Sequence, residues 1–394
     1  MKHIFFCTVA ALMLLSCGDD SIRISLANPL DFDRTSELTE IEASLIPADF
    51  SSKSYILLND KGAELPWQLS ANGALFIFQA DVPAKASVVY KLKEGVPAEV
   101  IPRTFARFVP ERKDDFSWEN DMAAYRMYGP ALAAENPSNG VDLWLKCTDE
   151  LITAKLYADE LERGISYHEN SSGLGLDCYD VKHTAGAGGI APYTYKLWTG
   201  DHYDRFEILE NGPLRSVFTL YYDSALVDDE VYSEEITITT EAGSILNKAV
   251  VTYSGPKGSV RQAEAPAAKP SKAAPQVLKL AAGITLHDGS GEIFGDSEAS
   301  VIGYAETAVS TIKKEPQGQN YVGVYMPSSS GEINVEDNHQ LILSEYKVGE
   351  PLTYYFGGGW SKWKFPTAED WFAALRQFSL ARRQPLIIQI TKQD

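Results

Sequence analysis

The sequence has few cysteines, few basic residues and, beyond its first seventeen residues, no long hydrophobic run. Only 4 Cys occur among 394 residues, too few for a disulfide-built scaffold or a set of zinc modules. Asp and Glu number 54 against 35 Lys and Arg, so the formal net charge is −19. A chain this acidic repels phosphate backbones, which argues against nucleic acid as a partner.

The chain also lacks the short motifs of several enzyme classes. No H-E-x-x-H, C-x-x-C or G-x-S-x-G sequence occurs. The Gly-rich stretches at 173–175 and 186–189 lack the G-x-G-x-x-G frame of a nucleotide cradle. Residues 114–121 lack the Gly and the final Glu of an EF-hand loop. We therefore expect no resident cofactor and no motif-encoded metal site.

A targeting signal occupies the first seventeen residues, MKHIFFCTVAALMLLSC. One Lys precedes an apolar stretch that is too short to span a bilayer and ends in LLSC at 14–17. This ending resembles the lipobox of bacterial lipoproteins, in which the Cys is lipidated and becomes the mature N-terminus. We expect residues 1–16 to be a signal peptide, Cys17 to carry the lipid and residues 17–30 to be a linker.

Lipidation would anchor the protein at the outer membrane, on its periplasmic or its cell-surface face, whereas an ordinary secretory signal is the alternative. Residues 18–20, Gly-Asp-Asp, look like the acidic export tag of surface lipoproteins. Disulfides are permitted outside the cytoplasm. Cys147 and Cys178 are therefore either paired or two small buried side chains, and the sequence leaves both possibilities open.

Most of the remaining chain predicts short strands joined by turns. Apolar runs between turn residues predict strands at 55–58, 75–78, 87–92, 216–222, 235–239, 277–280, 341–343 and 386–390. A capping-box-like start at Thr367 predicts one helix, ending before Pro385 and packed on a sheet. We expect an all-β fold, a large antiparallel β-sandwich forming one domain over 31–394. The Pro-, Ala- and Lys-rich stretch 255–276 predicts a disordered surface loop.

Residues 112–215 are dense in aromatic, acidic and Gly residues. They contain, in order, WENDMAAYRMYGP, GVDLW, YH, GLGLDCYDV, AGAGG and NGPLR. These segments resemble a bacterial family of unknown function found beside polysaccharide-degrading enzymes. The resemblance implies a β-sandwich similar to galactose mutarotases and polysaccharide-lyase sandwiches, and a role on an oligosaccharide or polysaccharide fragment. It supplies no established mechanism, and Lys182-His183-Thr184 departs from the family pattern.

The same segments hold the residue types of a sugar site. Sugars require flat apolar faces for stacking and hydrogen-bonding groups at their edges. Trp118 and Trp144 are the candidate stacking residues, although either could be a core residue instead. The acidic residues that could bind hydroxyl groups or transfer protons are Glu119, Asp121, Asp142 and Asp177.

His168 is the preferred residue for proton transfer, because an ordinary histidine titrates near working pH. Tyr128 or Tyr179 could carry the second proton, and His202 is a weaker choice than His168. Arg126 or Arg215 could bind the carboxylate of a uronic acid, since arginine grips carboxylates bidentately. Both arginines could equally be paired with acids inside the protein.

Two reactions and two non-catalytic roles fit these residues. An Arg with a His or Tyr base would serve elimination at a uronic acid. Paired carboxylates, Glu119 with Asp177 or Asp142 with Asp177, would serve hydrolysis. We therefore expect an exported, lipid-anchored protein that acts on an oligosaccharide by elimination or hydrolysis. The alternatives are a glycan-binding lipoprotein without turnover and a structural protein of the cell surface, in which these aromatic residues would only be packed.

Overall fold

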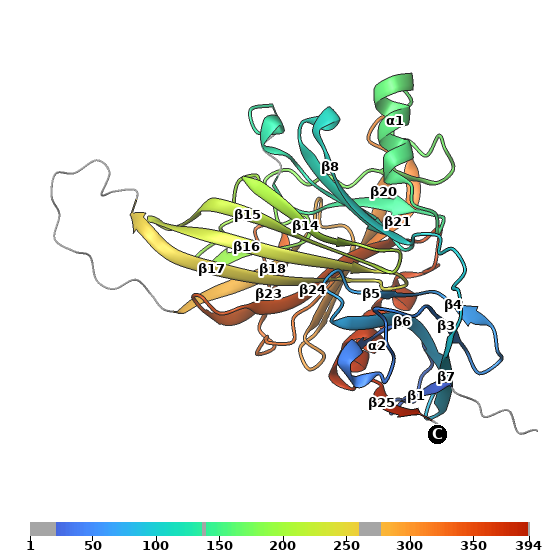
Figure 1. Cartoon of the computed structure of the whole chain (residues 1–394). Coiled ribbons are helices and arrows are strands. Elements are labelled where there is room, and N and C mark those ends of the chain that lie inside the picture. Colours follow the sequence, from blue (N-terminus) through green and yellow to red (C-terminus); the bar gives the residue numbers. More distant parts are fainter. Residues whose placement is uncertain (1–20, 136–138, 260–276, 393–394) are drawn as a thin grey trace, which may run out of the picture.

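An eight-stranded antiparallel sheet forms the centre of the protein (Figure 1). The computed structural model describes residues 21–135, 139–259 and 277–392. In spatial order the strands are β14 (Arg205–Asn211), β15 (Arg215–Val227), β16 (Glu230–Glu241), β17 (Asn247–Ser259), β24 (Leu352–Trp360), β21 (Pro316–Tyr325), β20 (Val301–Val309) and β19 (Glu292–Asp296).

Two smaller sheets pack side by side on one face of this sheet. The five-stranded sheet has the order β12 (Gly175–Asp177), β11 (Asp142–Lys146), β10 (Ala124–Met127), β9 (Asp115–Asn120) and β8 (Thr104–Val109). The four-stranded sheet has the order β13 (Ala187–Tyr193), β18 (Val277–Thr285), β23 (His339–Lys347) and β22 (Ile333–Glu336). A parallel bridge between Val141 and Gly186 joins the two. Strands β8, β11 and β13 contact β15 and β24, which makes the assembly a β-sandwich.

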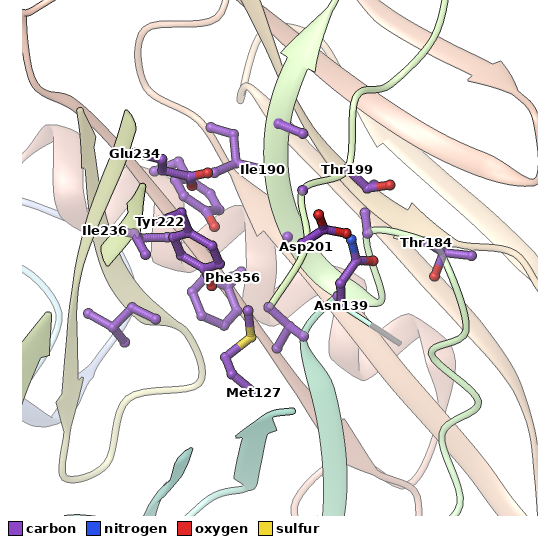
Figure 2. A pocket seen from close by; sticks show the side chains of 18 residues that line it. Met127, Asn139, Thr184, Ile190, Thr199, Asp201, Tyr222, Glu234, Ile236 and Phe356 are labelled. Atoms are coloured by element: carbon purple, nitrogen blue, oxygen red, sulfur yellow. The ribbon is translucent and has the colours of Figure 1, made fainter. Parts of the chain in front are cut away.

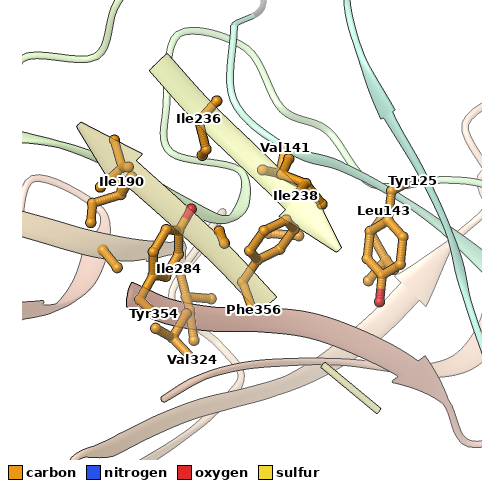
Figure 3. Close-up of a cluster of buried hydrophobic side chains, with 14 of the residues drawn as sticks. Tyr125, Val141, Leu143, Ile190, Ile236, Ile238, Ile284, Val324, Tyr354 and Phe356 are labelled. Carbon is orange, nitrogen blue, oxygen red and sulfur yellow. The ribbon is translucent and has the colours of Figure 1, made fainter. Parts of the chain in front are cut away.

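The main hydrophobic core lies between these layers (Figure 3). Side chains alternate between the two faces of a strand, so Ile236 and Ile238 of β16 point inward together with Phe356 of β24. From the opposite layer, Leu143 and Val141 pack against them. The fold class expected from the sequence, an antiparallel all-β sandwich, is confirmed.

The N-terminal strands build a separate core around Leu57 and Phe78. One sheet has the order β25 (Ile387–Lys392), β1 (Ile22–Ala27), β7 (Ser87–Glu94), β3 (Tyr55–Leu58) and β4 (Glu64–Leu65). A second has the order β2 (Arg34–Glu42), β6 (Leu75–Val82) and β5 (Trp67–Leu69). Strand β25 comes from the far end of the chain and pairs with β1, so both ends of the described chain meet in this sheet (Figure 1).

Helix α2 (Ala368–Arg383) confirms the helix expected near the C-terminus. Thr367 and Asp370 form the capping box that the sequence indicated. The helix packs on β20 and β21, where Gly303 and Gly323 lie opposite each other. A Cβ atom at Gly323 would lie 2.4 Å from Leu375, so these glycines allow the helix to approach the sheet.

Helix α1 (Thr153–Arg163) was not expected. Its N-cap residue, Ile152, has no side chain able to cap the first turn. The carboxylate of Glu119, on β9, accepts hydrogen bonds from the backbone N–H groups of Ile152 and Thr153, each at 2.8 Å. Because the capping carboxylate belongs to a residue more than thirty positions away, no local sequence pattern indicates where this helix begins.

Other expectations are corrected or lie outside the described residues. Residues 255–259 continue β17 and are not part of a loop, and the remainder of the predicted loop, 260–276, lies outside the described ranges. Cys147 and Cys178 are free thiols, so the disulfide alternative is not realised. The predicted signal peptide and Cys17 also lie outside the described residues. Within those residues, neither helix is long and apolar enough to cross a bilayer.

Replacing Thr367 with Ala should lower the free energy of unfolding by about 1 kcal/mol, because the Asp370 N–H in the first turn of α2 loses its side-chain acceptor. Urea denaturation at neutral pH measures the change. Gln377→Ala, at an exposed position of the same helix, is the matched control and should leave stability within about 0.5 kcal/mol. Equal stabilities for Thr367→Ala and wild type would contradict the capping role.

Candidate functional site

The outer face of the five-stranded sheet is charged, although it is buried. Phe116, Tyr125 and Leu143 point into the core, so strand alternation places their neighbours on the opposite face. Four buried charged residues lie together on this outer face, one from each of four adjacent strands: Asp115, Arg126, Asp142 and Asp177. Helix α1 contacts β9 on this side of the sheet.

Arg126 is the centre of this group, which we call the Arg126 network (Asp115, Arg126, Asp142 and Asp177). Its Nη2 atom lies 2.7 Å from Asp142 Oδ2 and 2.8 Å from Asp177 Oδ2. Its Nη1 atom lies 3.6 Å from Asp115 Oδ2. The arginine side chain is 1% exposed, and its guanidinium lies 5.1 Å from the centre of the Trp144 ring. Such a cation is stable only with closely placed counter-charges.

Burial raises the pKa of two carboxyl groups in the network. Burial, reinforced by the neighbouring charge of Asp177, raises the pKa of Asp142 to about 7. Burial also raises the pKa of Asp115. Among the described residues, Asp142 Oδ1 and Arg126 Nε have no hydrogen-bond partner. The network therefore keeps hydrogen-bonding capacity that its own members do not use.

His168 lies at the edge of the network and reaches the surface. Its side chain is 34% exposed, and its Nδ1 atom lies 3.0 Å from the backbone oxygen of Asp177. The same nitrogen lies 3.5 Å from the Asp177 carboxylate. The imidazole ring also contacts the Tyr167 ring, with the ring centres 4.7 Å apart. Of the acid–base residues expected from the sequence, His168 is the one that combines exposure with contact to the network.

The two expected tyrosines have different surroundings. Arg126 donates a hydrogen bond of 3.1 Å to the Tyr128 oxygen, and burial raises the pKa of Tyr128 well above its usual value. The Tyr179 hydroxyl donates to the backbone oxygen of Gly186 at 3.1 Å. Tyr128 belongs to the surroundings of the Arg126 network, and Tyr179 lies against the ring of His287, 4.8 Å between centres.

The expected stacking tryptophans are buried and leave no face for a sugar. Trp118 is 0% exposed, stacks on Tyr125 and belongs to the main core. Trp144 is 1% exposed and stacks on Tyr167 at 4.6 Å beneath α1. Both tryptophans are therefore core residues, the second of the two possibilities that the sequence left open. Strand alternation directs Trp118 into the main core, and helix α1 covers Trp144.

The remaining expected residues hold the scaffold together. Glu119 pairs with Lys146 at 3.0 Å and caps α1. Asp121 pairs with Arg103 and accepts the Gly243 N–H. The carboxylate oxygens of Glu119 and Asp121 are bound by these groups. Neither residue contributes to the Arg126 network.

Arg215 is likewise engaged within the protein. It binds Glu210 through two hydrogen bonds, of 2.9 and 2.8 Å, and also pairs with Glu40. Arg126 and Arg215 are therefore both paired with internal acids, the alternative to substrate binding that the sequence left open. Among the described residues, no group of three or more His, Cys, Asp or Glu is arranged to hold a metal ion.

A second polar feature, inside the sandwich, was missed from the sequence (Figure 2). A cavity of about 50 Å³ lies between the layers, with Glu234 and Tyr222 on one side and Asn139 and Asp201 on the other. The signal was present: Ile236 and Ile238 alternate inward, and the same period places Glu234 inward as well. A volume this small holds a few water molecules rather than a sugar ring.

Glu234 is surrounded by tyrosines. Its direct neighbours across β15 and β17 are Tyr222 and Tyr253. Burial raises the pKa of Glu234 to about 7, although a hydrogen bond with Tyr253 acts in the opposite direction. Among the described residues, the Tyr354 hydroxyl at this cavity has no hydrogen-bond partner. His202, the weaker histidine choice, follows Asp201 at the cavity, and burial lowers its pKa.

Glu234→Gln should change the pH dependence of stability. The Glu234 pKa of about 7 in the folded protein lies above its ordinary value of 4.5, so this group costs stability as pH rises through that interval. The amide does not titrate. The variant should therefore gain about 1–3 kcal/mol relative to wild type between pH 5 and pH 8.

Chemical denaturation across this pH range provides the measurement for Glu234→Gln. Glu235→Gln is the matched control, because Glu235 is the next residue on β16 and is exposed on the opposite face. Parallel stability curves for Glu234→Gln and wild type would contradict a buried, titrating Glu234.

Comparison with known proteins gives a family but no described activity. The chain is 26% identical to the uncharacterized protein P7 of Formosa agariphila, over 99% of this chain and 100% of that protein. Two solved structures from Enterococcus faecalis are similar in outline: a protein of glycosyl hydrolase family 38 and an alpha-mannosidase. Their TM-scores are 0.48 and 0.44, at 8% and 9% identity.

Each structural comparison covers 95% of this chain. The same comparisons cover only 48% and 46% of the two Enterococcus chains, so this chain spans about half their length. The family model for a domain of unknown function, DUF4861, matches residues 26–388. That match includes every strand of the sandwich and the whole Arg126 network. The chain belongs to the DUF4861 family.

Proposed function

We propose that this protein is an exported, lipid-anchored enzyme that removes a proton from a uronic acid sugar of an oligosaccharide, with His168 as the base and elimination as the reaction. The observation that carries the proposal is the position of His168. It is a part-exposed imidazole whose inner nitrogen contacts Asp177, a member of the buried Arg126 network. A base fixed in this way is oriented before substrate arrives.

The contact with Asp177 selects the tautomer of His168. A backbone oxygen can only accept a hydrogen bond, so the bond of 3.0 Å requires a hydrogen on Nδ1. The lone pair of the neutral ring then lies on Nε2, which becomes the proton acceptor. The Asp177 carboxylate, 3.5 Å from Nδ1, would stabilise the imidazolium that forms.

Tyr128 is the proposed proton donor. Arg126 donates to its oxygen, so the Tyr128 hydroxyl hydrogen remains available for another acceptor. Burial keeps this phenol protonated at neutral pH. In the proposed step, His168 takes the proton beside the sugar carboxylate and a carbon–carbon double bond forms. The glycosidic C–O bond breaks, and its oxygen receives a proton from Tyr128.

Elimination is favoured over hydrolysis because the expected carboxylate pairs are engaged. Asp142 and Asp177 both bind Arg126 Nη2, so they face a shared cation rather than an open space for a glycosidic bond. Glu119 is held by Lys146 and by the start of α1. A glycan-binding protein without turnover remains the second candidate, favoured by the internal pairing of both expected arginines.

The reaction is tested with the full chain carrying Cys17→Ser, which prevents lipidation, incubated with acidic plant and algal oligosaccharides. Mass spectrometry should find cleavage without the gain of water. His168→Ala should lower kcat by about 100-fold or more. His183→Ala removes another exposed histidine and is the matched control.

Products that gain one water would replace elimination with hydrolysis. Full turnover by His168→Ala would remove His168 from the mechanism. Oligosaccharides that bind and are recovered intact would favour the binding role instead.

The anchor is tested by expressing the full chain in a bacterium that processes lipoproteins. Wild-type protein should be found in the membrane fraction, since two or more acyl chains hold a protein stably at a bilayer. Cys17→Ser should be found in the soluble fraction, whereas Cys147→Ser, the control, should stay with the membrane. A Cys17→Ser protein that still sediments with the membrane would argue against lipidation.

A further inference from the structure

A surface pocket of about 300 Å³ is lined in part by Ser310, whose hydroxyl bonds to Glu169, the residue after His168. The proposed function does not use this pocket. The polar residues of its lining are Asp180, His287, Asp288, Glu306, Ser310 and Asn320, among others. We call it the Glu306 pocket. A volume of this size accommodates a small ligand such as one sugar ring.

The floor of the Glu306 pocket is a connected hydrogen-bond system. His287 Nδ1 lies 2.6 Å from Glu306 Oε1, and His287 Nε2 lies 2.9 Å from the backbone oxygen of Asp180. Asn320 donates to the same Glu306 oxygen at 3.1 Å. Burial, the largest single influence, lowers the pKa of His287, but the hydrogen bonds and charges of Glu306 and Asp180 together outweigh it, so the pKa is raised overall.

One buried polar atom at this pocket has no hydrogen-bond partner among the residues that the structure describes. Asn320 is 4% exposed and lines the pocket, and among the described residues its Oδ1 atom has no hydrogen-bond partner. A buried amide oxygen without a partner is costly, since it has lost its hydration. A ligand hydroxyl group donating to this oxygen would satisfy it.

The Glu306 pocket and His168 share one segment of chain. Asp177 binds His168 through its backbone oxygen, and Asp180, three residues later, binds His287 in the same way. A second link runs through Glu169, which accepts hydrogen bonds from Ser310 and from the backbone of Lys313. The pocket and the proposed base are thus fixed relative to each other through two independent connections.

The charge of the pocket distinguishes between sugar types. Three carboxylates line it, those of Asp180, Asp288 and Glu306, against the ammonium group of Lys314 and the imidazole of His287. The excess of negative charge and of hydrogen-bond acceptors disfavours a second carboxylate. Carboxylate and amide oxygens instead accept hydrogen bonds from sugar hydroxyl groups.

We propose that the Glu306 pocket is a subsite for one neutral sugar ring, next to the uronic acid on which His168 acts. This inference rests on the proposed function for the identity of the neighbouring sugar. It specifies the substrate class further, as an oligosaccharide in which a neutral sugar adjoins a uronic acid.

Binding is tested on the full chain carrying Cys17→Ser, by ligand-observed NMR and calorimetry. The probes are D-galactose, D-glucose, D-xylose, L-rhamnose and D-glucuronate. At least one neutral sugar should bind, with an affinity at least tenfold higher than that of D-glucuronate. Glu306→Gln should weaken this binding about tenfold or more, whereas Glu292→Gln, at an exposed position of β19, should not change it.

A second variant guards against a loss of folding in Glu306→Gln. Thr307 lines the pocket at an exposed position, so Thr307→Trp should fill the pocket without disturbing the core and should abolish binding. The inference is overturned by the absence of binding for every neutral sugar. Unchanged binding in Glu306→Gln and Thr307→Trp, or tighter binding of D-glucuronate, would overturn it as well.

His168→Ala separates this inference from the proposed function. The variant should bind the neutral sugar with wild-type affinity, because His168 is not part of the pocket lining. Sugar binding in a wild-type protein that turns over no oligosaccharide would support the subsite and reject the proposed enzyme. Turnover that depends on His168, without binding of any neutral sugar, would support the proposed enzyme and reject the subsite.

Discussion

The burial of one guanidinium dictates the arrangement of a large part of this protein. Arg126 is 1% exposed and is surrounded by three carboxylates, with Arg112 completing the group 3.9 Å from Asp115. Three negative and two positive charges leave one negative charge in excess. Protonation of Asp142, whose pKa is raised to about 7, would make the whole group neutral. Without that balance, removing these charges from water would be too costly.

This charged group gives the five-stranded sheet two buried faces of different character. Its inner face carries Trp118 and Leu143, which join the main core. Its outer face must be covered as well, because bulk water would compete for the ionic contacts of Arg126. Helix α1 provides this cover, with Tyr157 packed on Trp144, and Glu119 fixes the start of the helix. The position of helix α1 and the burial of the Arg126 network therefore depend on each other.

The short segment 177–180 connects the described features. Its first residue belongs to the Arg126 network and orients His168, and its last residue binds His287 at the Glu306 pocket. Between them, Tyr179 packs its ring on His287 and bonds to Gly186, near the bridge that joins the two small sheets. Proton transfer at His168 and sugar binding in the pocket would thus share one rigid support, which favours the precise placement that elimination requires.

Much of the fold was determined by local sequence, because local physics produces it. The alternation of Ile236 and Ile238 predicts a strand with one buried face, and Thr367 with Asp370 predicts the start of α2. These signals lie within a few residues of the elements they specify. The gathering of Arg126, Asp142, Tyr167, His168 and Asp177 in one region was also indicated by the density of such residues between 112 and 215.

Tertiary structure alone decided what those side chains do. Arg126 and Arg215 could have bound a substrate, but acids from other strands, such as Asp177 and Glu40, engage them instead. Trp118 is a core residue because β15 and β24 place Phe218 and Phe356 against it. These outcomes depend on contacts between residues far apart in the chain. The sequence by itself determined strands, one helix and the candidate chemistry, whereas burial and charge pairing in the assembled sandwich decided which side chains remain available for it.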